Sequence, residues 1–271
     1  MELACQTWKS QYTETKVVLL HGMGGTGRLW RPIAAGLEDQ FTILAPDQRG
    51  HGKSQTKQSS YTPIDYGNDL VETLTARNFH PAWLVGHSMG VRTACACAHL
   101  NPKLVQGLVL IDLGFEGPAG GGLGKNLRTF LKNLPLKFES REQAKNWLFK
   151  DTPDQSISQY LLAVSETNPD THQTTFPFDK NALIQTIESV QGFSLKLWIE
   201  SFGEKNLPIL ILRGENSKVF SKQEFEKEKK YFSKFKTIHF DEVKNATHGL
   251  PFEQRAIFSK KLIEFMKLNS A

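Results

Sequence analysis

The sequence predicts an α/β fold in which helices flank a mostly parallel central sheet and a mostly helical segment is inserted. Short apolar runs alternate with segments of helical length, which is the pattern of parallel strands covered on both faces. The stretch between Ile111 and Ile209 shows no convincing strand. The length of 271 residues allows one large core with such an insertion.

Six apolar runs have the length of buried strands and are bounded by turn-forming residues. The expected strands are Lys16–Leu20, Phe41–Ala45, Trp83–Val85, Leu108–Ile111, Ile209–Leu212 and Thr237–Asp241. One or two weaker edge strands are expected within Met1–Thr15. The expected helices are Trp30–Glu38, Ile64–Asn78, Met89–Leu100, Lys222–Phe232 and Phe252–Leu268.

The insertion shows apolar residues at helical spacing, such as Leu127, Phe130 and Leu134. We therefore expect a core of residues 1–113 and 206–271 and a helical cap of residues 114–205. Insertions at the carboxyl edge of strands commonly act as lids and form the substrate pocket. The glycine-rich stretch Gly114–Gly124, which opens the insertion, is interpreted equally well as a hinge or as a flexible linker.

The formal net charge of +5 raises the question of a nucleic-acid partner, which the distribution of charge disfavours. In the densest basic stretch, Lys218–Lys236, lysines interleave with glutamates as on a solvated helix face. Met1–Lys16 lacks the pattern of a secretory signal, and no apolar run approaches the roughly 20 residues that span a bilayer. We therefore expect a cytoplasmic protein with no nucleic-acid partner and no transmembrane segment.

The three cysteines are too few, and odd in number, for a disulfide framework. Cys95 and Cys97 fall on the helix expected after residue 88, where small buried thiols are a simpler interpretation than metal ligands or redox centres. The sequence predicts no metal and no organic cofactor.

Residues 86–90 read Gly-His-Ser-Met-Gly and directly follow the apolar run at residues 82–85. A strand that reverses sharply into a helix leaves no room for Cβ atoms two residues on either side of the apex. The apex residue is then held in strained backbone geometry with its side chain exposed. Ser88 is therefore the candidate nucleophile, and a glycine-serine loop that matches by chance is the simpler alternative.

A serine nucleophile needs a base, and His248 is the candidate among eight histidines. It stands in a loop (residues 245–249, Asn-Ala-Thr-His-Gly) between the last expected strand and the last helix. A loop at the carboxyl end of a strand can bring His248 over Ser88. His239 lies within a strand and His87 is held beside the nucleophile, so both are interpreted as structural.

Four motifs together resemble the α/β-hydrolase family across the whole core. They are His-Gly at residues 21–22, Asp-Gln-Arg-Gly-His-Gly-Lys-Ser at 47–54, the serine motif at 86–90 and the histidine loop at 245–249. The resemblance implies an α/β-hydrolase fold and a Ser–acid–His triad in that chain order. It implies no catalytic role for His51.

The acid departs from the family's commonest pattern, because residues 214–218 (Gly-Glu-Asn-Ser-Lys) contain no Asp. Asp112 stands at the end of the strand that follows the nucleophile's helix, from which a carboxylate can reach a histidine above Ser88. This arrangement resembles the YbfF-like subgroup of bacterial esterases, in which the earlier Asp serves. We favour Asp112; Glu215, a dyad without an acid, or another carboxylate remain alternatives.

The predicted function is a serine hydrolase that cleaves carboxylic esters or thioesters of small to medium acyl substrates through an acyl-enzyme. The backbone N–H of Met89, at the start of a helix, is one expected oxyanion donor, and the resemblance implies the N–H of Met23 as the other. The same triad also serves C–C bond hydrolases, amidases and perhydrolases. The expected partner is a small-molecule substrate, and the chain is expected to be a monomer or a homodimer.

Two other classes of protein remain alternatives. Residues 22–27 match the dinucleotide-binding pattern G-x-G-x-x-G, and Asp47 follows at about the expected distance. That interpretation leaves Ser88 and His248 unexplained, whereas an oxyanion loop explains the glycines. A catalytically silent fold that binds a ligand is the second alternative, and an intact Ser88 and His248 argue against it.

Overall fold

The computed structural model describes residues 1–55, 58–117, 123–151 and 155–269. Within these ranges a seven-stranded sheet has the order β1-β3-β2-β4-β5-β9-β10. Its strands are β1 Cys5–Trp8, β2 Lys16–Leu20, β3 Thr42–Pro46, β4 Ala82–His87, β5 Val105–Ile111, β9 Ile209–Gly214 and β10 Ile238–Val243. In this sheet only the edge strand β1 pairs antiparallel, with β3, and the other pairs are parallel.

The predicted fold class is confirmed, and all six expected strands are present, with ends that differ by at most three residues from those expected. The longer helices around the sheet are α2 Pro63–Ala76, α3 Met89–Leu100, α8 Lys196–Glu204, α9 Lys222–Phe232 and α11 Arg255–Leu268. The expected edge strand within Met1–Thr15 is β1. The six parallel strands all end at the same edge of the sheet, where the loops that follow them gather.

Two expected helices are wrong in extent. The segment expected as Trp30–Glu38 is a 3₁₀ turn, η1 (Gly27–Trp30), followed by the single-turn helix α1 (Arg31–Ala34). Gly36 lies two residues after the end of α1, and glycine is a poor helix former. The last expected helix is divided into α10 (Leu250–Glu253) and α11, because Gln254 between them has φ −120° and ψ 49°.

Apolar clusters cover both faces of the sheet, since successive residues of a strand point to opposite faces. In β2, Val18 and Leu20 join the cluster beneath α2, α3, α8 and α9, whereas Val17 and Leu19 join the cluster beneath α1 and α11. Strands buried on both faces read as continuous apolar runs, which is why the sequence showed them clearly.

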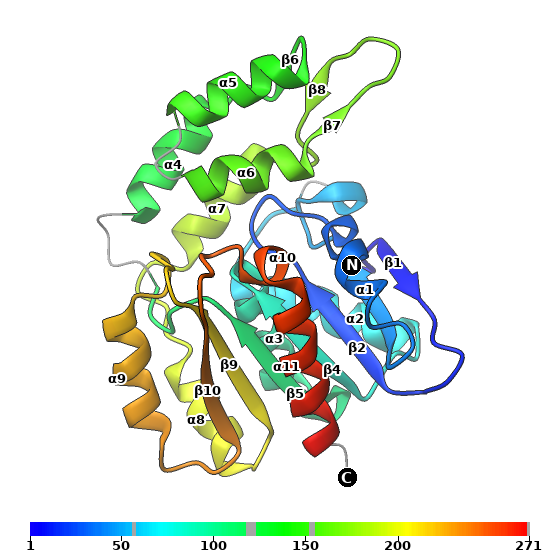
Figure 1. Cartoon of the computed structure of the whole chain (residues 1–271), viewed down its shortest axis with the longest axis vertical. Coiled ribbons are helices and arrows are strands. Elements are labelled where there is room, and N and C mark those ends of the chain that lie inside the picture. Colours follow the sequence, from blue (N-terminus) through cyan, green and yellow to red (C-terminus); the bar gives the residue numbers. More distant parts are fainter. Residues whose placement is uncertain (56–57, 118–122, 152–154, 270–271) are drawn as a thin grey trace.

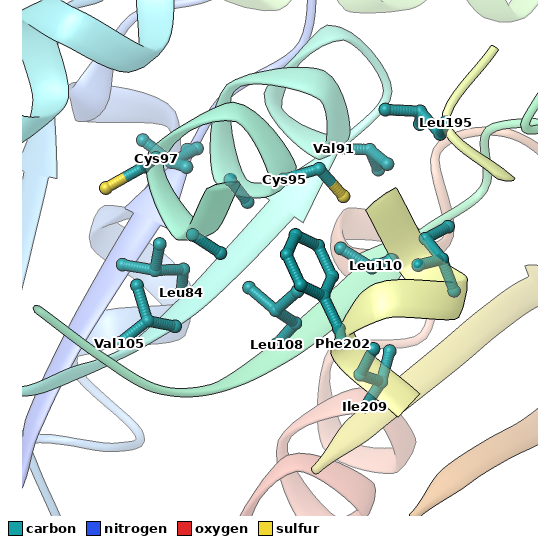
Figure 2. Packing of buried hydrophobic residues seen from close by; sticks show 14 of the residues in the cluster. Leu84, Val91, Cys95, Cys97, Val105, Leu108, Leu110, Leu195, Phe202 and Ile209 are labelled. Carbon is teal, nitrogen blue, oxygen red and sulfur yellow. The ribbon is translucent and has the colours of Figure 1, made fainter. Parts of the chain in front are cut away.

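The predicted burial of the two neighbouring thiols is confirmed. Cys95 and Cys97 are free and buried on α3, and Figure 2 shows both among the apolar residues that α3 packs on β4 and β5. Burial raises the pKa of both thiols, that of Cys97 to about 12. They therefore pack as small apolar side chains.

The insertion extends from one end of the molecule (Figure 1) and consists of four helices and a small sheet among its described residues. The helices are α4 Leu123–Asn133, α5 Arg141–Asp151, α6 Gln155–Val164 and α7 Lys180–Ser189, and the strands are β6 Lys137–Phe138, β7 Glu166–Thr167 and β8 Thr174–Thr175. These strands have two residues each, too short to leave an apolar run in the sequence. The insertion has an apolar cluster of its own.

The expected range of the insertion, residues 114–205, stays a prediction, and the packing of α8 bears on where the insertion ends. Helix α8 lies within the expected range 114–205, yet Ile199 and Phe202 of this helix pack in the cluster beneath the sheet. We propose that the insertion ends after α7. Part of the glycine-rich stretch expected as a hinge or linker, residues 118–122, lies outside the described residues. Within the described ranges, no helix is long and apolar enough to cross a bilayer.

Candidate active site

Ser88 occupies a sharp turn between β4 and α3, with φ 54° and ψ −120°. This positive φ is strained for a residue with a Cβ, so the predicted strain at the apex is confirmed. A Cβ on Gly86 would lie 2.3 Å from the carbonyl oxygen of Gly90, and a Cβ on Gly90 would lie 2.5 Å from that of Leu20. Both glycines are therefore required by close packing around the turn.

A chain of hydrogen bonds joins three side chains that lie far apart in the sequence. His248, in the loop between β10 and α10, lies with Nε2 3.0 Å from Ser88 Oγ and with Nδ1 2.8 Å from Asp112 Oδ2. Because a carboxylate only accepts, Nδ1 carries the ring hydrogen and Nε2 is free to accept from the serine hydroxyl. The structure brings together the three residues that the sequence nominated.

Asp112 lies at the carboxyl end of β5, fully buried and with φ 56°. Its Oδ1 accepts a hydrogen bond of 2.9 Å from the backbone N–H of Gly214, and its Oδ2 accepts from the hydroxyl of Ser217. With the bond to His248, the buried carboxylate is satisfied on both oxygens, which a buried charge requires. Because β5 and β9 are neighbours in the sheet, residues 214–217 at the end of β9 lie beside Asp112.

Ser217 was missed by the sequence reasoning. The Gly-x-Asn-Ser stretch of residues 214–217 belongs to the pattern that resembles the YbfF-like subgroup, but no role was predicted for its serine. Glu215, the alternative acid, accepts a 2.8 Å hydrogen bond from the backbone N–H of Asn245 and is exposed. The carboxylate that lies against His248 is that of Asp112.

The two expected oxyanion donors belong to segments that lie next to Ser88. Met89 is the first residue of α3, so its N–H has no acceptor within the helix. Met23 lies in a turn closed by a 3.0 Å hydrogen bond from the N–H of Gly25 to the carbonyl of Gly22. This turn lies beside the serine, because a Cβ on Gly22 would be 3.1 Å from Ser88 Cβ.

Three buried histidines hold the surrounding loops as neutral rings. His51 Nε2 accepts from the N–H of Gly24, and His21 Nε2 accepts from the N–H of Gln48, each at 3.0 Å. Burial lowers the pKa of His51 to about 3 and that of His21 to about 4. Nε2 of His87 lies 2.8 Å from the carbonyl oxygen of His248, and burial lowers the pKa of His87 to about 3. These rings position backbone rather than exchange protons near neutral pH.

The glycine-rich turn at residues 22–27 is packed against β3. The carboxylate of Asp47 accepts from the N–H of Gly27 at 2.8 Å and from the N–H of Lys53 at 2.9 Å. A Cβ on Gly27 would lie 2.2 Å from the carbonyl oxygen of Ala45. Asp47 therefore binds the chain's own backbone, where the dinucleotide interpretation would have it bind a ribose. Across the residues that the structure describes, no group of three or more His, Cys, Asp or Glu is arranged to hold a metal ion.

Comparisons with known proteins agree on the family. A family model described as the alpha/beta hydrolase fold matches residues 15–246. A 2-(acetamidomethylene)succinate hydrolase of Mesorhizobium japonicum is 27% identical over 76% of this chain and 72% of its own length. A solved structure of a marine microorganism esterase superposes with a TM-score of 0.79 at 24% identity, covering 97% of this chain and 99% of that one.

An uncharacterised protein of Mycobacterium tuberculosis is 34% identical over 46% of this chain. The match covers 35% of that protein, so the chain spans about a third of the length of this curated relative. The finer assignment to the YbfF-like subgroup stays a prediction.

Proposed function

This chain belongs to the α/β-hydrolase fold family, and we propose that it is a serine hydrolase that cleaves carboxylic esters or thioesters of small to medium acyl substrates. The observation that carries the proposal is the continuous hydrogen-bond chain from Ser88 through His248 to Asp112. An alcohol alone is a weak nucleophile at neutral pH, and a base oriented by a carboxylate is what activates it.

In the proposed mechanism, Ser88 Oγ attacks the acyl carbonyl while its proton passes to His248 Nε2. Asp112 holds the imidazole in the tautomer that leaves Nε2 free and stabilises the imidazolium that forms. His248 then protonates the leaving oxygen or sulfur, and the acyl group remains on Ser88. A water molecule activated by the same histidine hydrolyses this acyl-enzyme and restores the serine.

The negative charge on the carbonyl oxygen needs donors that are already oriented. The N–H groups of Met23 and Met89 are proposed for this role, and such donors are worth roughly 2.7–4 kcal/mol each where they have been removed in other enzymes. The insertion is proposed to act as a cap, because residues of α6 contact the turn that carries Met23.

Ser88→Ala tests the proposal. We expect hydrolysis of p-nitrophenyl acetate and butyrate to fall by about 10⁴-fold or more, because the nucleophile is removed, and labelling by a fluorophosphonate probe to disappear. Thermal unfolding should show that the variant is folded. Ser233→Ala, which removes an exposed hydroxyl at the end of α9, is the control and should behave as the wild type.

Retained turnover in Ser88→Ala would overturn the proposal. A folded wild type that neither hydrolyses these esters nor reacts with the probe would instead favour a ligand-binding protein. A series of acyl chain lengths, run as esters and as acyl-CoA thioesters, distinguishes the two substrate classes.

A further inference from the structure

Tyr160 of α6 is a residue of the insertion that makes a hydrogen bond to the turn of residues 22–25. Its hydroxyl donates a hydrogen bond of 3.1 Å to the carbonyl oxygen of Gly22. A Cβ on Gly25 would lie 2.2 Å from the Tyr160 hydroxyl, so the turn leaves space for this side chain only because residue 25 is a glycine. The mechanism above does not use Tyr160.

The carbonyl oxygen of Gly22 receives three donors. Besides the Tyr160 hydroxyl, the N–H of Gly25 donates at 3.0 Å and Nδ1 of His21 donates at 2.8 Å. The ring of His21 carries its hydrogen on Nδ1, because Nε2 accepts from the N–H of Gln48. Two of these donors belong to the core, and the third comes from the insertion.

The carbonyl of Gly22 and the N–H of Met23 belong to one planar peptide group. Since this group is rigid and trans, its oxygen and its N–H point in opposite directions, and holding one orients the other. A carbonyl that accepts hydrogen bonds also polarises its peptide, which makes the N–H a stronger donor. The three donors on Gly22 therefore both aim and strengthen the N–H of Met23.

We propose that Tyr160 is a positioning residue through which the insertion orients the oxyanion donor Met23 N–H, so that the donor is correctly aimed only when α6 is seated on the core. This inference rests on the proposed function. Burial raises the pKa of the phenol, so the group stays protonated and remains a donor over the working pH range.

The packing of the neighbouring residues supports the same contact. Leu161 of α6 would lie 3.2 Å from a Cβ on Gly24, which has a φ of +78°. The ring centroids of His87 and Phe252 lie 6.3 Å and 6.5 Å from the ring centroid of Tyr160. Helix α6 therefore rests on the turn at two successive residues, with the Tyr160 ring held among aromatic groups of the core.

Tyr160→Phe tests the proposal, because it removes the hydroxyl and keeps the ring. We expect kcat for p-nitrophenyl acetate to fall about tenfold with KM nearly unchanged, as for the loss of one hydrogen bond felt in the transition state. Affinity for a trifluoromethyl ketone, whose adduct places an oxyanion beside Met23, should fall by a similar factor. Hydrogen–deuterium exchange of the peptide that contains residues 22–25 should become faster.

Thr186→Val is the matched control. Thr186 of α7 and Tyr66 of α2 form another hydrogen bond between insertion and core, 2.7 Å long, which does not involve residues 22–25. This variant should keep the wild-type kcat, inhibitor affinity and exchange at residues 22–25. Equal effects of the two variants, or a Tyr160→Phe variant indistinguishable from the wild type, would overturn the inference.

These results separate this inference from the proposed function. If wild-type protein hydrolyses the ester and Ser88 reacts with the fluorophosphonate probe, a silent Tyr160→Phe variant counts against Tyr160 alone. If the wild type has neither property, the proposed function itself has failed, and the role assigned to Tyr160 falls with it.

Discussion

At the scale of single residues, the buried carboxylate of Asp112 is the group that depends most on its surroundings. Its left-handed φ of 56° turns the chain at the end of β5 and directs the side chain toward His248. The N–H of Gly214 and the hydroxyl of Ser217 then satisfy the charge in a place that water does not reach. The end of β9 and the loop after it, where commoner members of the family carry the acid, here supply donors to Asp112, which directly follows β5.

Asp112→Asn should lower kcat for ester hydrolysis by about 10²- to 10⁴-fold, because an amide cannot fix the required tautomer or stabilise the imidazolium. Glu215→Gln should change kcat little, since the amide oxygen can still accept from the N–H of Asn245. Steady-state kinetics of the two variants make the comparison. A larger loss of kcat in Glu215→Gln than in Asp112→Asn would instead identify Glu215 as the acid.

At the scale of elements, the turn between β4 and α3 depends on how closely the helix approaches the sheet. Gly90, in the first turn of α3, contacts the backbone of β2 at Leu20, so the helix can start directly behind Ser88. The N-terminal N–H groups of α3 then point toward the site where the proposed mechanism places the developing negative charge. The glycines of the motif therefore set the position of a whole helix.

Gly90→Ala should lower the free energy of unfolding by roughly 1–3 kcal/mol, because the added methyl forces α3 away from β2. Ester hydrolysis should fall with it, since Ser88 and the N–H of Met89 move together. Gly36→Ala is the control, because there an added Cβ meets nothing closer than the carbonyl oxygen of Ile33 at 3.6 Å. Urea unfolding and kinetics check both variants, and equal stability of the two would contradict this account.

At the scale of the whole molecule, the described residues include one apolar cluster on each face of the sheet and a third within the insertion, besides the small cluster of Tyr61, Tyr66, Met89 and Ala182. The third cluster also contacts Met23 and Leu29 of the core, so the insertion packs on the turn beside Ser88. An insertion with its own core can open locally at a lower free energy than the sheet. Because the insertion has its own apolar cluster, α6 could move away from the turn beside Ser88 while Ser88, His248 and Asp112 keep their hydrogen bonds.

Leu134→Ala should destabilise the insertion selectively, by about 2–5 kcal/mol, because Leu134 is fully buried in its cluster. Hydrogen exchange should rise in α4, α6 and α7, and exchange in β4 and β5 should stay unchanged. Leu136→Ala, two residues away and 45% exposed, should have little effect. Uniformly faster exchange across sheet and insertion would show that the two unfold together.

Much of the fold could be predicted because the signals are local. The parallel strands are buried on both faces and read as apolar runs, and α3 and α9 begin and end where their patterns do. The short α1, the break at Gln254 and the small sheet of the insertion escaped prediction. Their boundaries depend on tertiary packing or on pairs of two-residue strands, which leave no periodic pattern.

The sequence by itself determined the fold class, the strained turn at Ser88 and the small set of candidates for its base and acid. Each of these could be predicted because it rests on an apolar run or a motif within a short stretch of the chain. The cytoplasmic location and the monomeric or homodimeric state stay predictions. The tertiary structure alone decided that Asp112 lies against His248, that Ser217 supports it and that Tyr160 holds Gly22. Asp112 and His248 are 136 residues apart, and only the order of β4, β5, β9 and β10 in the sheet brings their loops together.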